Sequence, residues 1–293
     1  MSYSIKATAR THPGLKRENN EDSYHVGNRL VVVADGTGGH EAGEVASAIT
    51  AEHFATIDEQ TIDPEFYVTL TAAIEESNEA IAAAVDASPE LAGMGTTATA
   101  VLFGDKRIAI ANVGDSRAYL YQREHGLMTQ FTNDDSFVQM LVDSGEITQE
   151  EAQHHPYRSV VLKSVNGKNV KPRFTTRVRM YGDRYLVCSD GLSDNVGAHD
   201  IQAALHLEDI DEAADKLLAL TLEAGAPDNV TVILADIIES AESPAIPPNG
   251  ADYPCTQPIR LGPEAYPPAA PIAAQNASTL PTSRRRRLAR GYS

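Results

Sequence analysis

The sequence predicts an α+β protein in which helices are layered on antiparallel strands, and three observations lead to this prediction. Residues 30–34 form an apolar, largely β-branched run that is typical of a strand buried on both faces. Two amphipathic stretches, 42–53 and 64–87, follow with apolar residues at three- and four-residue spacing. Segments 96–103 and 107–121 then predict a hairpin with long arms. Consecutive helices followed by consecutive strands favour layered helices and sheets over alternating βαβ units.

The other elements are assigned by the same criteria. Residues 4–10 alternate as a short strand, and the Asp-Pro pair at 63–64 supplies an N-cap and a first-turn proline for the second long helix. The segment 131–168 breaks the pattern, with short helices predicted at 136–143 and 148–153, and we interpret it as an insertion over the site. Further strands are predicted at 173–180, 183–189 and 230–238, with a helix at 211–224.

Composition divides the chain near residue 240. The net charge is −17, and residues 241–293, with three acids and six arginines, carry +3, which leaves −20 for residues 1–240. Residues 1–240 are predicted to form one domain. Ten of the 16 prolines lie in 241–293, which predicts a disordered Pro/Ala-rich tail whose arginine cluster at 284–287 is either an electrostatic handle or a solubilising end. A body this acidic disfavours nucleic acid and anionic lipid as partners.

Cysteine usage and hydropathy bear on the location of the protein. Cys188, in an apolar strand, and Cys255, in the tail, have the spacing of neither a zinc site nor a disulfide framework, which favours a reducing compartment. Residues 1–10 lack the apolar core of a signal peptide, and no apolar run approaches the roughly 20 residues of a membrane helix. We therefore expect a monomeric, cytoplasmic protein without a membrane span.

Acidic residues recur where the predicted strands end. An Asp-Gly pair after a single strand is the usual signature of a turn. An acid at each of four strand ends instead predicts carboxylates gathered around hard cations, which prefer oxygen ligands. Without cations such a cluster would repel itself. The acids are Asp35, Asp115, Asp190 and Asp228, together with Glu21 and Asp22 shortly before the 30–34 run.

One arrangement of these acids would prepare water for attack on phosphorus. In it Asp35 bridges two divalent ions, and Asp190 and Asp228 complete the coordination of one of them. The carbonyl of Gly36 and waters held by the acids at 21–22 complete the other. Water shared by two such ions is acidified enough to act as a nucleophile near neutral pH. The chain has no Cys-x5-Arg loop, Gly-x-Ser-x-Gly elbow or Gly-x4-Gly-Lys-Ser/Thr loop, which disfavours the phosphatase and hydrolase classes that use them.

Arg17 is the candidate for holding a phosphate. Its guanidinium is a planar, permanently charged fork, and its position four residues before Glu21 favours this role over a surface ion pair. A haloacid-dehalogenase motif is excluded because Val33 and Thr37 stand where a second aspartate would be needed, so Asp35 is predicted to be a ligand and not a phospho-acceptor. The histidine pair at 154–155 has no third ligand nearby and is interpreted as part of a solvated loop.

Six motifs occur in the same order as in a known enzyme family. They are Arg17–Asp22, Ala34–His40, Gly95–Thr97, Val113–Arg117, Ser189–Leu192 and Asp228–Thr231. Over roughly residues 4–238 the chain resembles the bacterial PPM (phosphatase 2C type) metal-dependent Ser/Thr protein phosphatases. The resemblance implies a four-layer αββα sandwich of two antiparallel β-sheets flanked by antiparallel helix pairs. It also implies Mn²⁺ or Mg²⁺ in a cleft at one end.

The resemblance also implies roles for individual residues. Segment 131–168 resembles the family's flap. Thr37 stands where bacterial relatives usually have methionine, which we expect to tune the pocket. His40 lies beyond the position of the histidine that eukaryotic relatives use, so leaving-group protonation is assigned to a metal-bound water in preference to His40. By motif position, the two core ions would be bound by Asp35, Gly36, Asp190 and Asp228. Metal waters would be ordered by Glu21 and Asp22, and the phosphate would be held by Arg17. A weaker third metal site would be formed by Asp115 with Asp190.

The predicted function is therefore metal-dependent hydrolysis of phosphoserine and phosphothreonine in proteins, with a Ser/Thr kinase and its substrates as expected partners. The alternative is a catalytically weak or dead phosphatase-like protein that binds phosphoproteins as a regulator. It is disfavoured because no metal-binding acid is missing from the motifs. A nuclease is disfavoured by the charge of −20 on residues 1–240.

Overall fold

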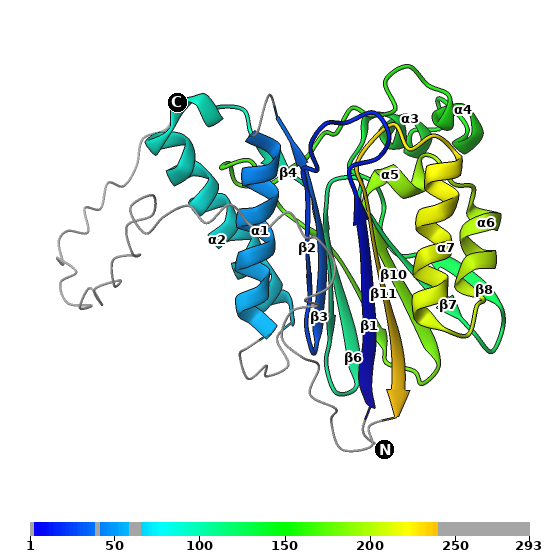
Figure 1. The fold of residues 1–293 in the computed structure, drawn as a ribbon. Helices are drawn as coiled ribbons and strands as arrows, with labels where there is room; N and C mark the ends of the chain where they lie inside the picture. Colours follow the sequence, from blue (N-terminus) through cyan, green and yellow to red (C-terminus); the bar gives the residue numbers. More distant parts are fainter. Residues whose placement is uncertain (1–2, 39–41, 59–65, 240–293) are drawn as a thin grey trace, which may run out of the picture. The chain divides into compact units, whose positions relative to one another are not determined.

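Eleven strands form two antiparallel sheets in the computed structural model, which describes residues 3–38, 42–58 and 66–239 (Figure 1). The first sheet contains, in order, β1 (Tyr3–His12), β11 (Val230–Glu239), β10 (Asp183–Cys188), β7 (Arg117–Gln122) and β8 (Leu127–Gln130). The second contains β2 (Asp22–Val26), β3 (Leu30–Thr37), β5 (Ala98–Phe103), β6 (Arg107–Val113) and β9 (Arg173–Val178), with β4 (Gly95–Thr96) paired to the end of β3.

Helices cover the outer face of each sheet (Figure 1). On the second sheet, α1 (Ala42–Asp58) packs against β2 and β3 and also contacts α2 (Phe66–Ala87), which is followed by the short 3-10 helix η1 (Pro89–Leu91). On the first sheet, α7 (Ile210–Glu223) packs against β1 and β11 and contacts α6 (Ala198–Leu205). The predicted four-layer αββα sandwich is confirmed.

The central apolar run explains how the layers hold together. Val31 and Val33 of β3 join a buried cluster between the two sheets, which includes Phe103 and Ile233. Because successive side chains of a strand point to opposite faces, the residues between them face α1. All of Leu30–Ala34 is buried, as predicted. A second buried cluster, which includes Cys188, lies between the first sheet and its helices.

The predicted hairpin is confirmed by the antiparallel pairing of β5 and β6, but its second arm was predicted too long. Residues 107–121 are not one arm of a hairpin, because the chain leaves the second sheet after β6 and enters the first sheet as β7. The crossing occurs at Gly114, which has φ of +100°, a conformation that a residue with a Cβ rarely adopts. Asp115, a predicted metal ligand, lies in this crossing. The short elements β2, β8, η1, α5 (Asp190–Ser193) and α6 were not predicted.

The flap segment, residues 131–168, contains α3 (Phe137–Asp143) and α4 (Gln149–Gln153). Ser136 and Thr148 cap their N-termini, the latter in a capping box with Glu151. The two ends of the segment meet through backbone hydrogen bonds from Phe137 N to Val160 O, at 2.8 Å, and from Leu162 N to Asp135 O, at 2.7 Å. The flap segment is therefore closed at its base.

Some sequence predictions concern residues outside the described ranges. These are the Asp-Pro helix start at 63–64, His40, Cys255 and the predicted tail with its arginine cluster. Within the described ranges, no helix is long and apolar enough to cross a membrane.

Candidate metal centre

The predicted acids lie at one end of the two sheets, because the strands that carry them begin or end there. Asp22 begins β2 and lies opposite Asp35 of β3 in the antiparallel register. β10 ends just before Asp190, β11 begins just after Asp228, and these two strands are antiparallel neighbours. Asp115 lies where the chain crosses from β6 to β7. Five separate segments of the two sheets thus bring carboxylates to one place.

Electrostatics shows that these acids are close enough to repel one another. Burial raises the pKa of Asp35 well above its usual range, and the charges of Asp22, Asp190, Asp115 and Asp228 raise it further. Burial likewise raises the pKa of Asp190, with added repulsion from Asp115 and Asp228. It raises the pKa of Asp22 to about 6 and that of Asp115 to about 7. Asp35 and Asp190 are each half-buried, enclosed by protein on most sides but reached by water.

Arg17 lies at the edge of this group and pairs with one of its members. Its Nη2 donates to Asp228 Oδ2 at 2.8 Å, and the two side chains are 53% and 38% exposed. An ion pair this exposed contributes little to stability, about 0–1 kcal/mol. Arg17, the predicted phosphate-binding residue, thus pairs with Asp228, a predicted metal ligand. Because the ion pair is exposed and weak, either partner can exchange it for another ligand.

The remaining acids fit a hard cation in their chemistry. Asp22 is buried and accepts a hydrogen bond from Ser189 at Oδ2, at 2.8 Å, whereas its Oδ1 has no partner. Asp35, Asp115 and Asp190 take part in no ion pair with any described residue. Buried carboxylates without a cationic partner are costly, and a divalent cation with oxygen ligands would compensate them.

The acids do not form a ready-made cage. Within residues 3–38, 42–58 and 66–239, no group of three histidine, cysteine, aspartate or glutamate side chains is arranged to hold a metal ion by itself. Asp228 is turned to Arg17, and hard cations take six or more oxygens, often including water. Completing a metal site here would require Asp228 to leave Arg17 and water to supply ligands.

A cleft of about 540 Å³ adjoins the acids on the side of Asp115. Its lining includes Asp115, Arg117 and Asp134 together with residues 193–197. Residues of α3 and α4 and the exposed Arg158 of the flap segment also line the cleft. The predicted insertion therefore lies beside the acids.

Comparison with known proteins identifies the chain. A model of the family described as protein phosphatase 2C matches residues 15–235. The chain belongs to the protein phosphatase 2C family. This agrees with the family that the six motifs indicated.

Individual phosphatase 2C relatives are similar over most of this chain. The serine/threonine protein phosphatase PstP of Mycobacterium tuberculosis is 46% identical over 262 residues, which is 89% of this chain but only 48% of PstP. This chain therefore spans about half the length of that relative. The serine/threonine phosphatase stp of Listeria innocua is 35% identical, with 79% of this chain and 96% of stp covered. A crystal structure of the PstP catalytic domain in complex with two manganese ions has a TM-score of 0.77 at 45% identity and covers 81% of this chain and all of that one.

Backbone contacts hold the central aspartate of this phosphatase 2C chain in place. Asp35 N donates to Thr97 Oγ1 at 2.9 Å, and Asp35 O accepts from Thr96 Oγ1 and Thr97 N, each at 2.9 Å. Thr97 Oγ1 also contacts Ser116 Oγ at 2.7 Å. The Gly95–Thr97 motif marked these positions, but the sequence analysis gave them no role.

Asn229 is a second positioning residue that the sequence analysis missed. Its Oδ1 accepts from Glu21 N at 2.8 Å, and its Nδ2 donates to Asn19 O at 2.8 Å and Pro13 O at 3.0 Å. The loop that carries Arg17 and Glu21 is thereby fastened to the start of β11. Its position directly after Asp228 was the available signal.

Gly36 is required by its close neighbours. A Cβ at this position would overlap the carbonyl oxygens of Gly43 and Glu21, and Gly36 N already donates to Glu21 O at 3.1 Å. The main chain beside Asp35 is thus packed tightly against the first turn of α1 and the start of β2. The predicted role of the Gly36 carbonyl as a ligand stays a prediction.

Other predicted residues lie at the margin. Thr37 is exposed. Glu21 is half-buried and its Oε1 accepts from Asn19 Nδ2 at 3.1 Å. Of the histidine pair, His154 is exposed and lines the cleft, whereas the ring of His155 lies near Phe137, with centroids 6.1 Å apart.

Proposed function

We propose that this chain hydrolyses phosphoserine and phosphothreonine in proteins with Mn²⁺ or Mg²⁺ as cofactor. The observation that carries the proposal is the convergence of carboxylates from separate strand ends, four of which form no ion pair with any described residue: the buried Asp22 and Asp115 and the half-buried Asp35 and Asp190. Family membership and the two manganese ions in the PstP catalytic domain support it. The alternative of a dead regulator is disfavoured, because all the acids of the motifs are present and lie at one end of the sheets.

The chain's own residues would divide the work as follows. Two divalent ions, when bound, would lower the pKa of a shared water and screen the phosphate charge. Asp35, Asp190 and Asp228 would hold the ions, with the acids at 21–22 orienting water ligands. Asp115 and Asp190 would hold a third, weaker ion.

Arg17 would bind two phosphate oxygens after leaving Asp228. Its ion pair with Asp228 is largely exposed, so the exchange of one anion for another carries a small free-energy change. The planar guanidinium suits bidentate binding of phosphate. Arg17 would orient the phosphorus toward the water held among the acids.

The wider setting is part of the same proposal. We propose a Ser/Thr kinase and its substrates as partners, a cytoplasmic location and a monomeric state. Residues 1–240 would carry the activity, and residues 241–293 would form a tail. Cys188, which is free and buried, suits a reducing compartment.

A phosphothreonine peptide tests the proposal. With Mn²⁺ present we expect release of inorganic phosphate, measured colorimetrically, and no release in excess EDTA until Mn²⁺ is restored. Insensitivity to okadaic acid would separate this activity from that of other phosphatase classes. Binding of the phosphopeptide without turnover at any Mn²⁺ or Mg²⁺ concentration would favour the regulator instead.

A further inference from the structure

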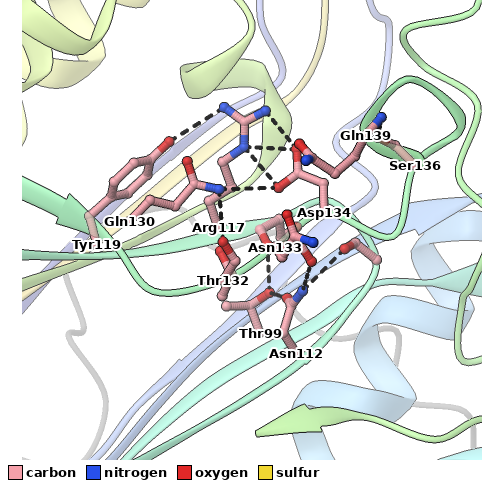
Figure 2. A network of polar contacts seen from close by, with 12 residues as sticks. Thr99, Asn112, Arg117, Tyr119, Gln130, Thr132, Asn133, Asp134, Ser136 and Gln139 are labelled. Carbon is pink, nitrogen blue, oxygen red and sulfur yellow. Dashed lines mark hydrogen bonds and ion pairs between the residues drawn. The ribbon is translucent and has the colours of Figure 1, made fainter. Parts of the chain in front are cut away.

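Arg117 connects the acids to the flap segment. It is the first residue of β7, two positions after Asp115, and it pairs in register with Cys188 at the end of β10. Its Nε donates to both carboxylate oxygens of Asp134 at 3.0 Å, and its Nη2 donates to Asp134 Oδ2 at 2.6 Å (Figure 2). The side chains are 19% and 6% exposed, so the pair is shielded from water and salt.

Asp134 belongs to the base of the flap segment, and its surroundings fix its orientation. Gln130 Nε2 donates to Asp134 Oδ1 at 3.4 Å and to Thr132 O at 3.0 Å, and Arg117 Nη1 donates to Tyr119 OH at 3.4 Å (Figure 2). The contacts join β7 and β8 to the first residues of the segment. Because the Arg117 guanidinium contacts both Tyr119 and Asp134, it fixes the orientation of the Asp134 carboxylate.

The neighbouring aspartate ties both ends of the flap segment to the crossing that carries Asp115. Asp135 N donates to Gly114 O at 2.9 Å. Its buried Oδ1 accepts from Lys163 Nζ at 2.7 Å and from Arg173 Nε at 3.0 Å. Lys163 comes from the far end of the segment, so the base, the far end and the crossing meet at Asp135.

Arg117 and Asp134 also line the cleft, as do Asp115 and the α3 residue Gln139. Each charge of the pair is already engaged by the other. The pair therefore contributes shape to the wall and no free charge for a ligand. Breaking the pair would remove one link between the flap segment and β7 and leave the contacts of Asp135 in place.

We propose that Arg117 is a positioning residue, which through Asp134 holds the flap segment at a fixed distance from Asp115 and so shapes the cleft for the residues that flank the phosphorylated side chain. This inference rests on the function proposed above. A small phosphoester needs only the acids and Arg17, whereas a polypeptide also lies along the walls. Loss of the pair should therefore affect the polypeptide substrate selectively.

The chain offers a matched control. Arg184 and Asp236 form a pair of the same kind, with Nε to Oδ1 at 2.6 Å and Nη2 to Oδ2 at 2.8 Å. Arg184 is at the opposite end of the β7–β10 ladder, where it lies opposite Tyr121. Asp236→Asn therefore weakens a buried ion pair in the same sheet without touching the cleft.

The test compares Asp134→Asn, Asp236→Asn and the wild-type chain on a phosphothreonine peptide and on p-nitrophenyl phosphate, with saturating Mn²⁺. Asp134→Asn should lower kcat/KM for the peptide about tenfold, mainly through KM, and change that for p-nitrophenyl phosphate by less than about threefold. Asp236→Asn should change neither. A parallel fall on both substrates, or no fall on either, would overturn the proposal.

Arg117 itself is tested by a graded pair of variants. Arg117→Met removes the charge and the fork, whereas Arg117→Lys keeps the charge and a single donor. Peptide KM should rise most in Arg117→Met and less in Arg117→Lys. An equal KM for the peptide in both variants and the wild type would contradict a role for the Arg117 guanidinium.

Amide hydrogen exchange gives a readout that needs no turnover. Asp134→Asn should speed exchange of the amides of Phe137 and Leu162, which close the base of the flap segment, and Asp236→Asn should not. Unchanged protection in Asp134→Asn overturns this proposal. A wild-type chain that hydrolyses neither substrate, by contrast, overturns the function proposed above, so the two failures are distinguishable.

Discussion

Aspartates at the two ends of the first sheet differ in whether the fold gives them a cationic partner. At one end Asp236 of β11 is bound by Arg184, whose side chain is fully buried, and by Arg123 at 2.9 Å. At the other end Asp190, which follows β10, faces other carboxylates, among them Asp22 of the second sheet, and burial raises the pKa of both. Strand β10 runs from Arg184 almost to Asp190, six residues or roughly 20 Å at the rise of a β-strand.

The difference separates aspartates that hold the fold together from those kept for a ligand. Arg184 also donates to the carbonyls of Leu205, Leu207 and Glu208, so it caps the end of α6 while it neutralises Asp236. The acids at the other end do not stabilise the fold in this way, and their repulsion is relieved only by protons or cations. A buried charge that the fold leaves uncompensated marks a site of function.

The largest effect is expected at the uncompensated end. Asp35→Asn and Asp190→Asn should each lower Mn²⁺-dependent turnover of p-nitrophenyl phosphate by more than about 100-fold, the upper range for residues that only support metal ligands. Because each change removes mutual repulsion, the melting temperature in EDTA should not fall.

Isothermal titration with Mn²⁺ checks the cause of this loss. Binding should weaken in both variants and stay unchanged in Asp236→Asn. Turnover by Asp35→Asn or Asp190→Asn close to that of the wild type would show that the converging acids are not the metal site.

The compensated end should respond in stability and not in turnover. Arg184→Met leaves Asp236 with Arg123 as its remaining guanidinium partner and removes three bonds to backbone carbonyls. Breaking a buried pair on one side typically lowers the free energy of unfolding by about 3–5 kcal/mol. Urea unfolding measures this loss. Turnover per folded molecule should be retained at 20 °C, and a loss of turnover without a loss of stability would contradict the contrast between the two ends.

The pH dependence of stability should also distinguish the two ends. Folding raises the pKa of Asp115 to about 7, so in metal-free protein the folded state binds more protons than the unfolded state between about pH 4 and pH 7. The protonated form of Asp115 therefore favours the folded state at low pH, and this contribution to the free energy of unfolding is lost as the pH rises through about 7. Asp115→Asn should be more stable than the wild type at pH 8 in EDTA, by up to about 4 kcal/mol, with little difference near pH 4.

Thermal unfolding in EDTA at several pH values measures this effect. Asp236→Asn, which removes a compensated carboxylate, should be less stable than the wild type at pH 8. If Asp115→Asn is also less stable there, Asp115 is stabilised by the fold and does not belong with the uncompensated acids.

The layers of helices and sheets and the position of the acids at strand ends could be predicted from the sequence, but the crossing of the chain from one sheet to the other could not. The run at Leu30–Ala34 and the Asp-Gly pairs are local patterns, and local patterns predict strands and their ends. The transfer at Gly114 is not local, because whether β7 continues the second sheet or joins the first depends on its pairing with β10. The hairpin of β5 and β6 was therefore predicted correctly, but its second arm was extended too far, to residue 121.

Residue roles show the same limit. The motifs marked Arg17, Asp228 and Asn229, but the sequence did not reveal that Arg17 pairs with Asp228 or that Asn229 fastens the loop before β2. Such contacts join residues about 200 positions apart, and no periodicity within either segment encodes them. Ordered motifs can indicate which residues matter before geometry shows what each one touches.

The smallest effect on stability is expected at Arg17, the cation at the edge of the uncompensated end. Arg17→Ala breaks an exposed pair with Asp228 and should change the free energy of unfolding by less than about 1 kcal/mol. Inhibition by inorganic phosphate should nevertheless weaken about tenfold, because a charge-assisted bond to a bound anion contributes about 1.5 kcal/mol or more. Lys16→Ala, which removes the adjacent exposed cation, is the control and should leave phosphate inhibition unchanged. Equal phosphate inhibition in Arg17→Ala and the wild type would confine Arg17 to its pair with Asp228, and the uncompensated end would then bind phosphate through its cations alone.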